Sequence, residues 1–337
     1  MERSSDAALV APCVAFVTLG CAKNEADTAR MRVRLAEAGF LIEDDPAEAD
    51  AVVVNTCSFI QSATEESIEA VFDAAGMPNV AAGAPLIVAG CMPARYGEDL
   101  ADELVEARAF VPCSREDDIA AIVADALGVD APGGGAAASV TLSASGGAAE
   151  VEGSRAALAA LPAAPFAYVK ISDGCDRFCT YCTIPYIRGR YRSFPLDDVR
   201  ADVAAQVAAG AREIVLIAQD TGRWGADFEE PSSLAALVTA LAERHPRTWF
   251  RVMYVQPEGV DDALLDAVAS HPNVCPYFDL PLQHVDASLL AAMNRKGSRE
   301  DFLALAERIR TKVPHAVLRT TLIAGFPGET EEQFEDL

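Results

Sequence analysis

Three cysteines spaced C-x3-C-x2-C constrain this chain more than any other feature: Cys175, Cys179 and Cys182, called here the loop cysteines. They follow residues 166–171, whose β-branched and aromatic residues alternate as in a strand, so a loop leaving that strand's carboxyl end is predicted to carry them. Three thiolates suit a soft centre such as zinc, copper(I) or an iron–sulfur cluster. A closed zinc site needs a fourth ligand, and the nearest downstream histidine is His245. The spacing favours a cubane with one open iron; a zinc knuckle or simply buried cysteines are the alternatives.

The composition indicates two ordinary globular domains. Hydrophobic residues make up 51% of the 337 residues, and no run of eighteen apolar residues occurs. Residues 1–12 lack the basic start and apolar core of a signal peptide. We therefore expect a soluble, cytoplasmic protein. Nine cysteines, an odd number in a long chain, fit metal binding or catalysis in a reducing compartment better than a secreted disulfide framework.

The net charge of −24 is unevenly distributed. Residues 1–165 hold 9 basic and 26 acidic residues, whereas residues 166–337 hold 18 and 25. Because phosphate backbones require a basic surface, nucleic acid is disfavoured as the primary ligand, and a basic protein partner is favoured. The alternative is an acidic proteome in which every surface is acidic.

Strands alternate with helices through residues 1–128, which predicts a doubly wound parallel sheet with right-handed crossovers, as in flavodoxin-like folds. The strands are expected at residues 13–19, 51–54, 86–89 and 110–111, and the helices at about residues 22–38, 61–74 and 116–127.

Three cysteines each lie one or two residues beyond the carboxyl end of a predicted strand: Cys21, Cys57 and Cys91, called here the sheet-edge cysteines. Because the carboxyl ends of parallel strands share one edge of a sheet, these thiols are expected to meet as a second three-thiolate site. The remaining cysteines show no such arrangement and are expected to be ordinary buried residues: Cys13, Cys113 and Cys275.

Residues 129–164 are rich in Ala, Gly, Ser and Pro, which predicts a flexible linker between two domains. Residues 165–337 then alternate again. Strands are expected at residues 166–171, 213–218, 249–255, 276–280 and 317–323, and helices at about residues 196–208, 233–244, 261–270 and 299–311. Five βα steps predict a partial TIM-type (β/α)6 barrel, truncated after its fifth strand, whose functional face lies at the strand carboxyl ends.

Six motifs carry a resemblance over nearly the whole chain: Leu19-Gly-Cys-Ala-Lys-Asn24, Val54-Asn-Thr-Cys57, Ala89-Gly-Cys91, the C-x3-C-x2-C loop, Arg188-Gly-Arg-Tyr-Arg-Ser193 and Gly325-Phe-Pro-Gly-Glu329. The chain resembles the radical S-adenosylmethionine methylthiotransferases. Residues 55–60 and 278–284 are similar to the branch that methylthiolates the β-carbon of an aspartate in ribosomal protein uS12. The Ser-Gly-Ser that follows Leu-Pro-x-Gln in the tRNA-modifying branch is absent.

The resemblance implies two [4Fe–4S] clusters and S-adenosylmethionine as cofactors. The loop cysteines would hold the cluster that cleaves the cofactor to a radical, which then abstracts a hydrogen. The sheet-edge cysteines would hold the second cluster, where sulfur is methylated and transferred. Implied partners are uS12 or the small ribosomal subunit, and an electron donor such as flavodoxin or ferredoxin. Family members continue into a further strand and a C-terminal TRAM module, both expected to be absent here.

Other cofactor-binding residues are expected near the strand ends: Gln219, Asp220, Gln283, His284, Arg319, Gly325 and Gly328. Gln219 and Asp220 would bind the ribose or amino group, and Arg319 the carboxylate. The glycines would allow close backbone approach. A plain loop or solvated-charge role is the alternative for each. No catalytic residue is assigned beyond the cluster ligands. Two other functions stay open, a tRNA adenosine methylthiotransferase and an iron–sulfur electron carrier without catalysis.

Overall fold

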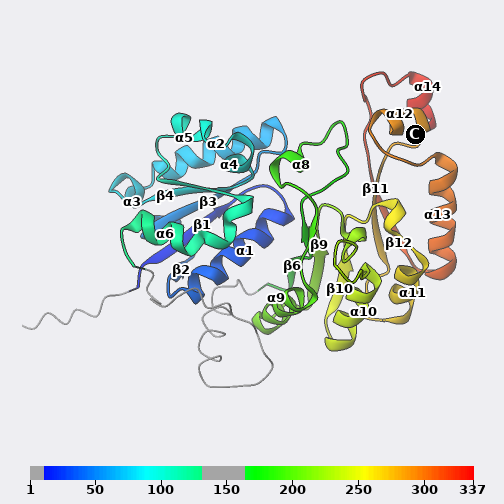
Figure 1. Ribbon diagram of the computed structural model, residues 1–337, viewed down its shortest axis with the longest axis horizontal. Helices are drawn as coiled ribbons and strands as arrows, with labels where there is room; N and C mark the ends of the chain where they lie inside the picture. The colour runs from blue at the N-terminus through cyan, green and yellow to red at the C-terminus, as the bar shows by residue number, and fades with distance from the viewer. Residues whose placement is uncertain (1–10, 131–163) are drawn as a thin grey trace, which may run out of the picture. The chain divides into compact units, whose positions relative to one another are not determined.

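The computed structural model describes residues 11–130 and 164–337. The chain divides into two units, Met1–Pro162 and Ala163–Leu337 (Figure 1). Nearly all of the expected linker, residues 129–164, lies outside the described residues, so its flexibility stays a prediction. None of the described helices has both the length and the apolar composition that a membrane crossing requires.

The first unit is built on a parallel sheet of five strands in the order β2-β1-β3-β4-β5. The strands are β1 (Cys13–Thr18), β2 (Leu41–Glu43), β3 (Ala51–Thr56), β4 (Leu86–Gly90) and β5 (Ala109–Pro112). This order is that of flavodoxin-like folds, so the predicted architecture is confirmed. The sequence did not predict β2, because three residues at a sheet edge form no apolar run.

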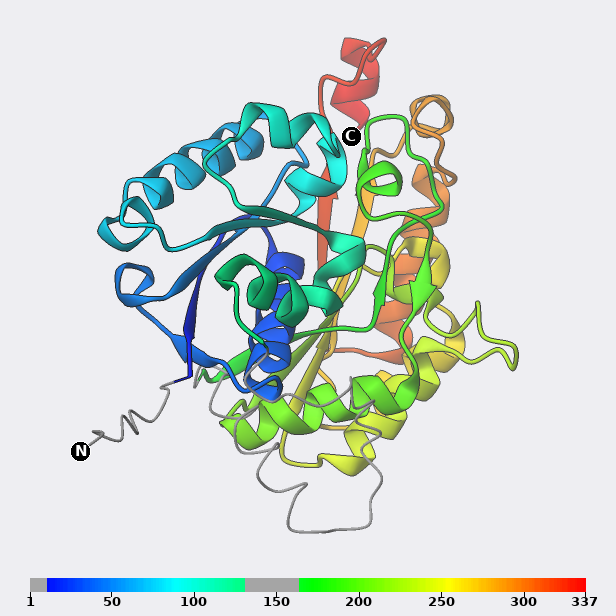
Figure 2. The same cartoon turned by 60° about the vertical axis from the view of Figure 1, so that its left-hand side comes forward.

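Helices cover both faces of this sheet (Figures 1 and 2). They are α1 (Ala22–Glu37), α2 (Gln61–Ala75), α3 (Pro78–Ala81), α4 (Cys91–Tyr96), α5 (Asp99–Glu103) and α6 (Ile119–Leu127), with 3-10 turns at Pro46–Glu48 and Cys113–Asp118. Val53 of β3 packs in the core beneath α1 and α6, whereas Val52 and Val54 pack in the core beneath α2. This two-sided burial explains the continuous apolar run of β3. The expected helix at 116–127 begins as a 3-10 turn and becomes α-helical only at Ile119.

The second unit has five parallel strands, β6 (Phe166–Lys170), β9 (Glu213–Ile217), β10 (Trp249–Val252), β11 (Tyr277–Gln283) and β12 (Val317–Leu322). β6, β9 and β10 form one sheet and β11 pairs with β12, while a bridge between Phe250 and Val274 connects β10 to the residues just before β11. Apolar residues of the helices α9 (Leu196–Ala209), α10 (Leu234–Arg244), α11 (Asp262–Ser270) and α13 (Arg299–Lys312) share one core with these strands. The predicted partial barrel is confirmed.

Helices alternate with these strands as expected. They are α8 (Ile184–Ile187), α9 (Leu196–Ala209), α10 (Leu234–Arg244), α11 (Asp262–Ser270), α12 (Ala287–Ala292), α13 (Arg299–Lys312) and α14 (Glu331–Asp336), with 3-10 turns at Thr221–Arg223 and Pro257–Gly259. The prediction missed the short helices α8 and α12. It also missed a short antiparallel pair, β7 (Ser172–Asp173) with β8 (Arg192–Ser193), which closes the base of the cysteine loop.

The prediction of three ordinary buried cysteines was wrong for two of them. Cys275 is buried, but Cys13 and Cys113 are only partly covered. Cys13 begins the strand next to edge strand β2, and its thiol lies 3.3 Å from a carboxylate oxygen of Asp50. Edge positions and turns leave side chains within reach of water, which an apolar sequence context does not reveal.

Candidate functional site

The sheet-edge cysteines lie around Gly20 and Asn24, at the ends of neighbouring strands. The Cys21 and Cys91 thiols lie 3.8 Å and 4.0 Å from the Asn24 Oδ1 atom. Cys57 packs against Gly20 so closely that a Cβ atom at Gly20 would lie 2.6 Å from the Cys57 Cβ. Strands β1, β3 and β4 are neighbours in the sheet and end just before these cysteines. The structure therefore places all three cysteines at the same edge of the sheet, and their role as ligands of one cluster stays a prediction.

A buried amide network fixes Asn24 beneath these thiols. Its Nδ2 atom donates to the Thr56 carbonyl at 2.8 Å, and Asn55 Nδ2 donates to the Asn24 carbonyl at 2.9 Å. Asn55 also donates to Thr28 Oγ1 at 2.9 Å, and both asparagines are fully buried. Because each buried amide is paired, the thiol-facing Asn24 oxygen is held in one place. Sequence reasoning named neither asparagine as functional, although both lie inside the quoted motifs.

The loop cysteines also face one another. The Cys182 amide donates to the Cys179 carbonyl at 3.0 Å, and the Cys175 amide donates to the Gly189 carbonyl at 3.1 Å. Burial is the main cause that raises the pKa of the Cys175 and Cys182 thiols, and the neighbouring Cys179 thiol raises both further. Thiols that interact in this way form one electrostatically coupled group, which binding of a soft metal would convert to thiolates.

Neither cysteine group has the geometry of a single-ion site. Across residues 11–130 and 164–337, no three Cys, His, Asp or Glu side chains are close enough to hold one metal ion. In a cubane each thiolate binds a different iron, so its ligands stand farther apart than those of one zinc ion.

Residues 292–295, at the end of α12 and just after it, support the cysteine loop. Thr180 donates through its amide to the Met293 carbonyl at 3.2 Å and through its hydroxyl to the Ala292 carbonyl at 3.0 Å. The side-chain Nδ2 atom of Asn294 donates to the backbone carbonyls of Arg177 and Phe178 at 2.9 Å and 3.1 Å. Asn294 adopts φ 56°, a left-handed conformation that Asn tolerates better than most residues. The loop is therefore held by residues that sequence reasoning did not anticipate.

Unpaired polar atoms collect where β9 ends. Both side-chain polar atoms of Gln219 and the Oδ1 atom of Asp220 are buried without a hydrogen-bond partner. The other Asp220 oxygen accepts from Arg177 Nε at 2.7 Å, and Arg177 also pairs with Glu258. Burial raises the pKa of Asp220, and Arg177 opposes that rise. Buried polar groups normally have partners, so these three atoms fit a polar ligand bound beside the loop cysteines.

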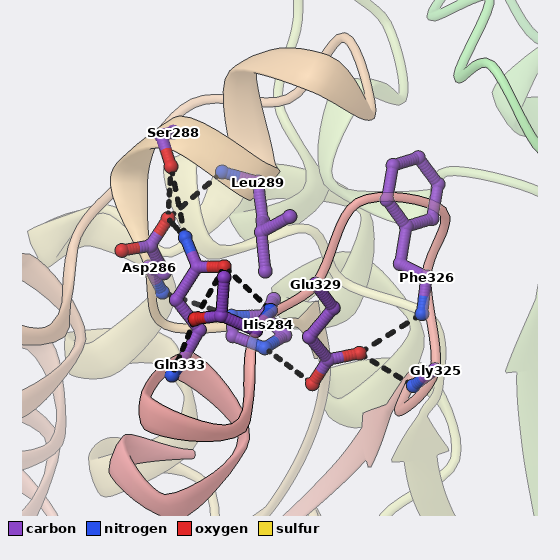
Figure 3. Close-up of polar contacts among 9 residues, drawn as sticks. His284, Asp286, Ser288, Leu289, Gly325, Phe326, Glu329 and Gln333 are labelled. Atoms are coloured by element: carbon purple, nitrogen blue, oxygen red, sulfur yellow. Dashed lines mark hydrogen bonds and ion pairs between the residues drawn. The ribbon is translucent and has the colours of Figure 1, made fainter.

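His284 occupies the end of β11 but is already paired. It is fully buried, its Nδ1 atom accepts from the Asp286 amide at 3.0 Å, and its Nε2 atom lies 3.4 Å from Glu329. The Glu329 carboxylate also accepts from the amides of Gly325 and Phe326, as Figure 3 shows. His284 and Glu329 thus hold the turn after β12 in place, a role that sequence reasoning did not assign to Glu329.

Of the remaining predicted residues, Gln283 ends β11, Gly325 and Gly328 follow β12, and Arg319 lies inside β12. Arg319 of β12 donates to Asp279 Oδ1 at 2.6 Å, so its first partner lies within the protein. Gln283 has φ 73°, and Gly325 and Gly328 have φ 77° and 91°. A Cβ atom at either glycine would meet nothing within 4 Å. Backbone conformation therefore accounts for these glycines, and their predicted approach to a cofactor stays a prediction.

Helix α14 is tied to the same region. Thr330 and Gln333 form a reciprocal capping box at its first turn. The side-chain Nε2 atom of Gln333 donates to Asp286 Oδ1 at 3.0 Å and to Ser288 Oγ at 3.1 Å, at the start of α12 (Figure 3). These contacts fasten the segment after β12 to the segment after β11.

Comparison with protein families matches both units. Residues 13–112 match the Uncharacterized protein family UPF0004, and residues 169–337 match the Radical SAM superfamily. The ribosomal protein uS12 methylthiotransferase RimO of Natranaerobius thermophilus is 36% identical over 96% of this chain and 71% of its own length. The protein of that name from Geobacter sulfurreducens is 41% identical over 96% of this chain and 70% of its own length. The chain belongs to the uS12 methylthiotransferase family. The predicted resemblance is confirmed.

Solved structures share the fold of this family member. The radical S-adenosylmethionine methyltransferase TsrM from Kitasatospora setae aligns with a TM-score of 0.67 at 15% identity, covering 97% of this chain and 72% of that one. The cobalamin-dependent S-adenosylmethionine radical enzyme OxsB aligns with a TM-score of 0.61 at 12% identity, covering 93% of this chain and 49% of that one. At such identities the likeness concerns the fold alone.

Proposed function

We propose that this uS12 methylthiotransferase family member adds a methylthio group to the β-carbon of an aspartate in ribosomal protein uS12. The observation that carries the proposal is the presence of two separate groups of three neighbouring cysteines, with the loop cysteines beside unpaired buried polar atoms. An electron carrier needs no such ligand pocket. A transferase that both activates a substrate carbon and supplies sulfur needs two centres.

The loop cysteines would hold one [4Fe–4S] cluster and the sheet-edge cysteines the other. With S-adenosylmethionine bound, the first centre supplies radical chemistry able to break an unactivated C–H bond. Gln219 and Asp220 would bind the polar part of this cofactor, because their unpaired atoms provide both donors and acceptors. Arg177 fixes Asp220 and belongs to the cysteine loop itself, so it orients the cofactor relative to the cluster.

Charge supports a protein substrate. Residues 1–165 hold 26 acidic and 9 basic residues, which suits a basic partner such as a ribosomal protein and disfavours tRNA. We also propose that the protein acts in the cytoplasm, on uS12 or the small ribosomal subunit. Its electrons would come from a small carrier such as flavodoxin or ferredoxin.

Mass spectrometry of uS12 and of tRNA from cells lacking the gene tests this function. We expect uS12 to lose its methylthio group and tRNA to stay unchanged, with restoration by the wild-type gene. A gene in which the loop cysteines are replaced by Ala should not restore the modification. Loss of a tRNA methylthio group instead would favour the tRNA alternative. Cofactor reduction assays separate the third possibility, because an electron carrier would release no 5′-deoxyadenosine.

A further inference from the structure

Arg295 places a guanidinium beside one of the loop cysteines. Its Nη1 atom lies 4.0 Å from Cys179 Sγ, at the outer limit for a hydrogen bond to sulfur. Its Nη2 atom donates to Gln256 Oε1 at 2.6 Å and to the Pro281 carbonyl at 2.8 Å, which fixes the orientation of the group. The side chain is partly buried, and its Nε atom is buried without a partner.

Arg295 differs from other arginines around the loop in how its charge is balanced. Arg177 pairs with Asp220 and Glu258, and Arg188 lies 3.5 Å from Asp173. Within the described ranges Arg295 makes no direct ion pair, and its fixed partners are a neutral amide and a carbonyl. The nearby carboxylate of Glu258, whose pKa Arg177 and Arg295 both help to lower, is paired directly with Arg177. The positive charge of Arg295 is therefore not neutralised by direct contact and acts on the adjacent thiol.

We propose that Arg295 is a positioning residue that donates to the Cys179 thiolate and raises the reduction potential of the cluster held there. The inference rests on the proposed function, since it requires a cluster on the loop cysteines. Reduction adds one negative charge to a cluster, so a nearby cation stabilises the reduced state more than the oxidised state. Hydrogen bonds to cluster sulfurs act in the same direction.

The neighbouring residues provide matched controls. Asn294 holds the loop through two amide hydrogen bonds but carries no charge, so Asn294→Gly removes the bonds while keeping the left-handed backbone accessible. Lys296 is exposed and carries the same charge as Arg295. Lys296→Met therefore removes an equal charge that makes no contact with the thiol.

The full chain is first reconstituted anaerobically with iron and sulfide. A potentiometric titration then measures the reduction potential, with the electron paramagnetic resonance signal of the reduced cluster as the readout. Replacing the sheet-edge cysteines with Ala leaves one cluster to titrate, and iron is counted for every variant. In Arg295→Gln we expect a reduced-to-oxidised ratio about tenfold lower at a fixed potential. For one electron this is a shift of about 59 mV to lower potential. Lys296→Met should titrate like the parent, whereas Asn294→Gly, which loosens the loop, should lose iron faster.

A titration of Arg295→Gln that matches the parent would overturn the proposal, as would an equal shift in Lys296→Met. If Arg295→Gln holds no iron, Arg295→Lys decides. Lysine lacks the planar fork that reaches Gln256 and Cys179 together, so its potential should lie below that of the parent. An unchanged potential in Arg295→Lys would then overturn the role of the guanidinium. Methylthiolation of uS12 by the wild-type protein is assayed separately, so failure of the proposed function does not alter this comparison.

Discussion

Arg177→Met tests how the cysteine loop is fastened to the end of β9. Arg177 Nε lies 2.7 Å from Asp220 Oδ2, and the two side chains are 20% and 1% exposed. Removing one partner of a buried pair costs about 3–5 kcal/mol, because the other charge stays buried. Since water reaches Arg177 and its second partner Glu258 is half-exposed, we expect a smaller loss of about 2–3 kcal/mol in unfolding free energy at neutral pH.

Tryptophan fluorescence during urea unfolding reports on the second unit of the chain, which contains Arg177. Both tryptophans of the chain, Trp224 and Trp249, belong to the second unit, and Trp224 is buried in its core. The loss should appear as a lower urea midpoint at an unchanged slope. Lys312→Met breaks an exposed pair with Asp266 and is the matched control, expected to leave the midpoint unchanged. Equal midpoints for Arg177→Met and this control would refute the reasoning.

The pH dependence of the same variant has a definite sign. Burial raises the pKa of Asp220, and Arg177 opposes that rise. Without Arg177 the pKa of folded Asp220 rises further, so the folded protein binds this proton more tightly than the unfolded chain. The destabilisation should therefore be full above the folded pKa and fade as the pH falls toward the unfolded value of about 3.9. Adding Asp220→Asn should recover part of the loss at neutral pH. No recovery would mean that the buried charge is not the cause.

Anaerobic reconstitution should give about eight irons per chain by colorimetric analysis, and replacing either cysteine group with Ala should halve this count. Only the loop-cysteine variant should lose cofactor cleavage; iron unchanged in the sheet-edge variant would remove the second cluster. Glu329→Gln weakens the acceptor for Phe326 and the contact with His284, which hold the turn after β12 in place. Because this turn carries the predicted cofactor-binding residues Gly325 and Gly328, equilibrium dialysis should show about tenfold weaker S-adenosylmethionine binding at unchanged iron content. Association with uS12 should slow as salt rises, because the screening length falls to about 8 Å at physiological ionic strength. Tight tRNA binding with undetectable uS12 binding would contradict the assignment.

Local patterns were enough to predict the strands and the position of the cysteines at their ends. β3 has a continuous apolar run because Val53 and its neighbours Val52 and Val54 fill cores on opposite faces of the sheet. Such a run is visible without coordinates, and a cysteine just beyond it must lie at the carboxyl edge. Both cysteine groups, the parallel sheets and the family resemblance could be read from such patterns. The strand β2 was not predicted, because its three residues lie at the edge of the sheet and form no apolar run.

The side chains that hold the cysteines became visible only in the folded chain. Asn294 binds the Arg177 carbonyl across 117 positions, and Arg295 reaches Cys179 across 116. Asn55 reaches the Asn24 backbone across 31 positions. In sequence, an Asn or Arg that binds a distant carbonyl or thiol looks the same as a solvated one, because propensity and periodicity describe only neighbours along the chain. Packing of strands and helices decides which distant polar groups are brought together, and where they are fully buried, as Asn24 and Asn55 are, burial also forces them to pair.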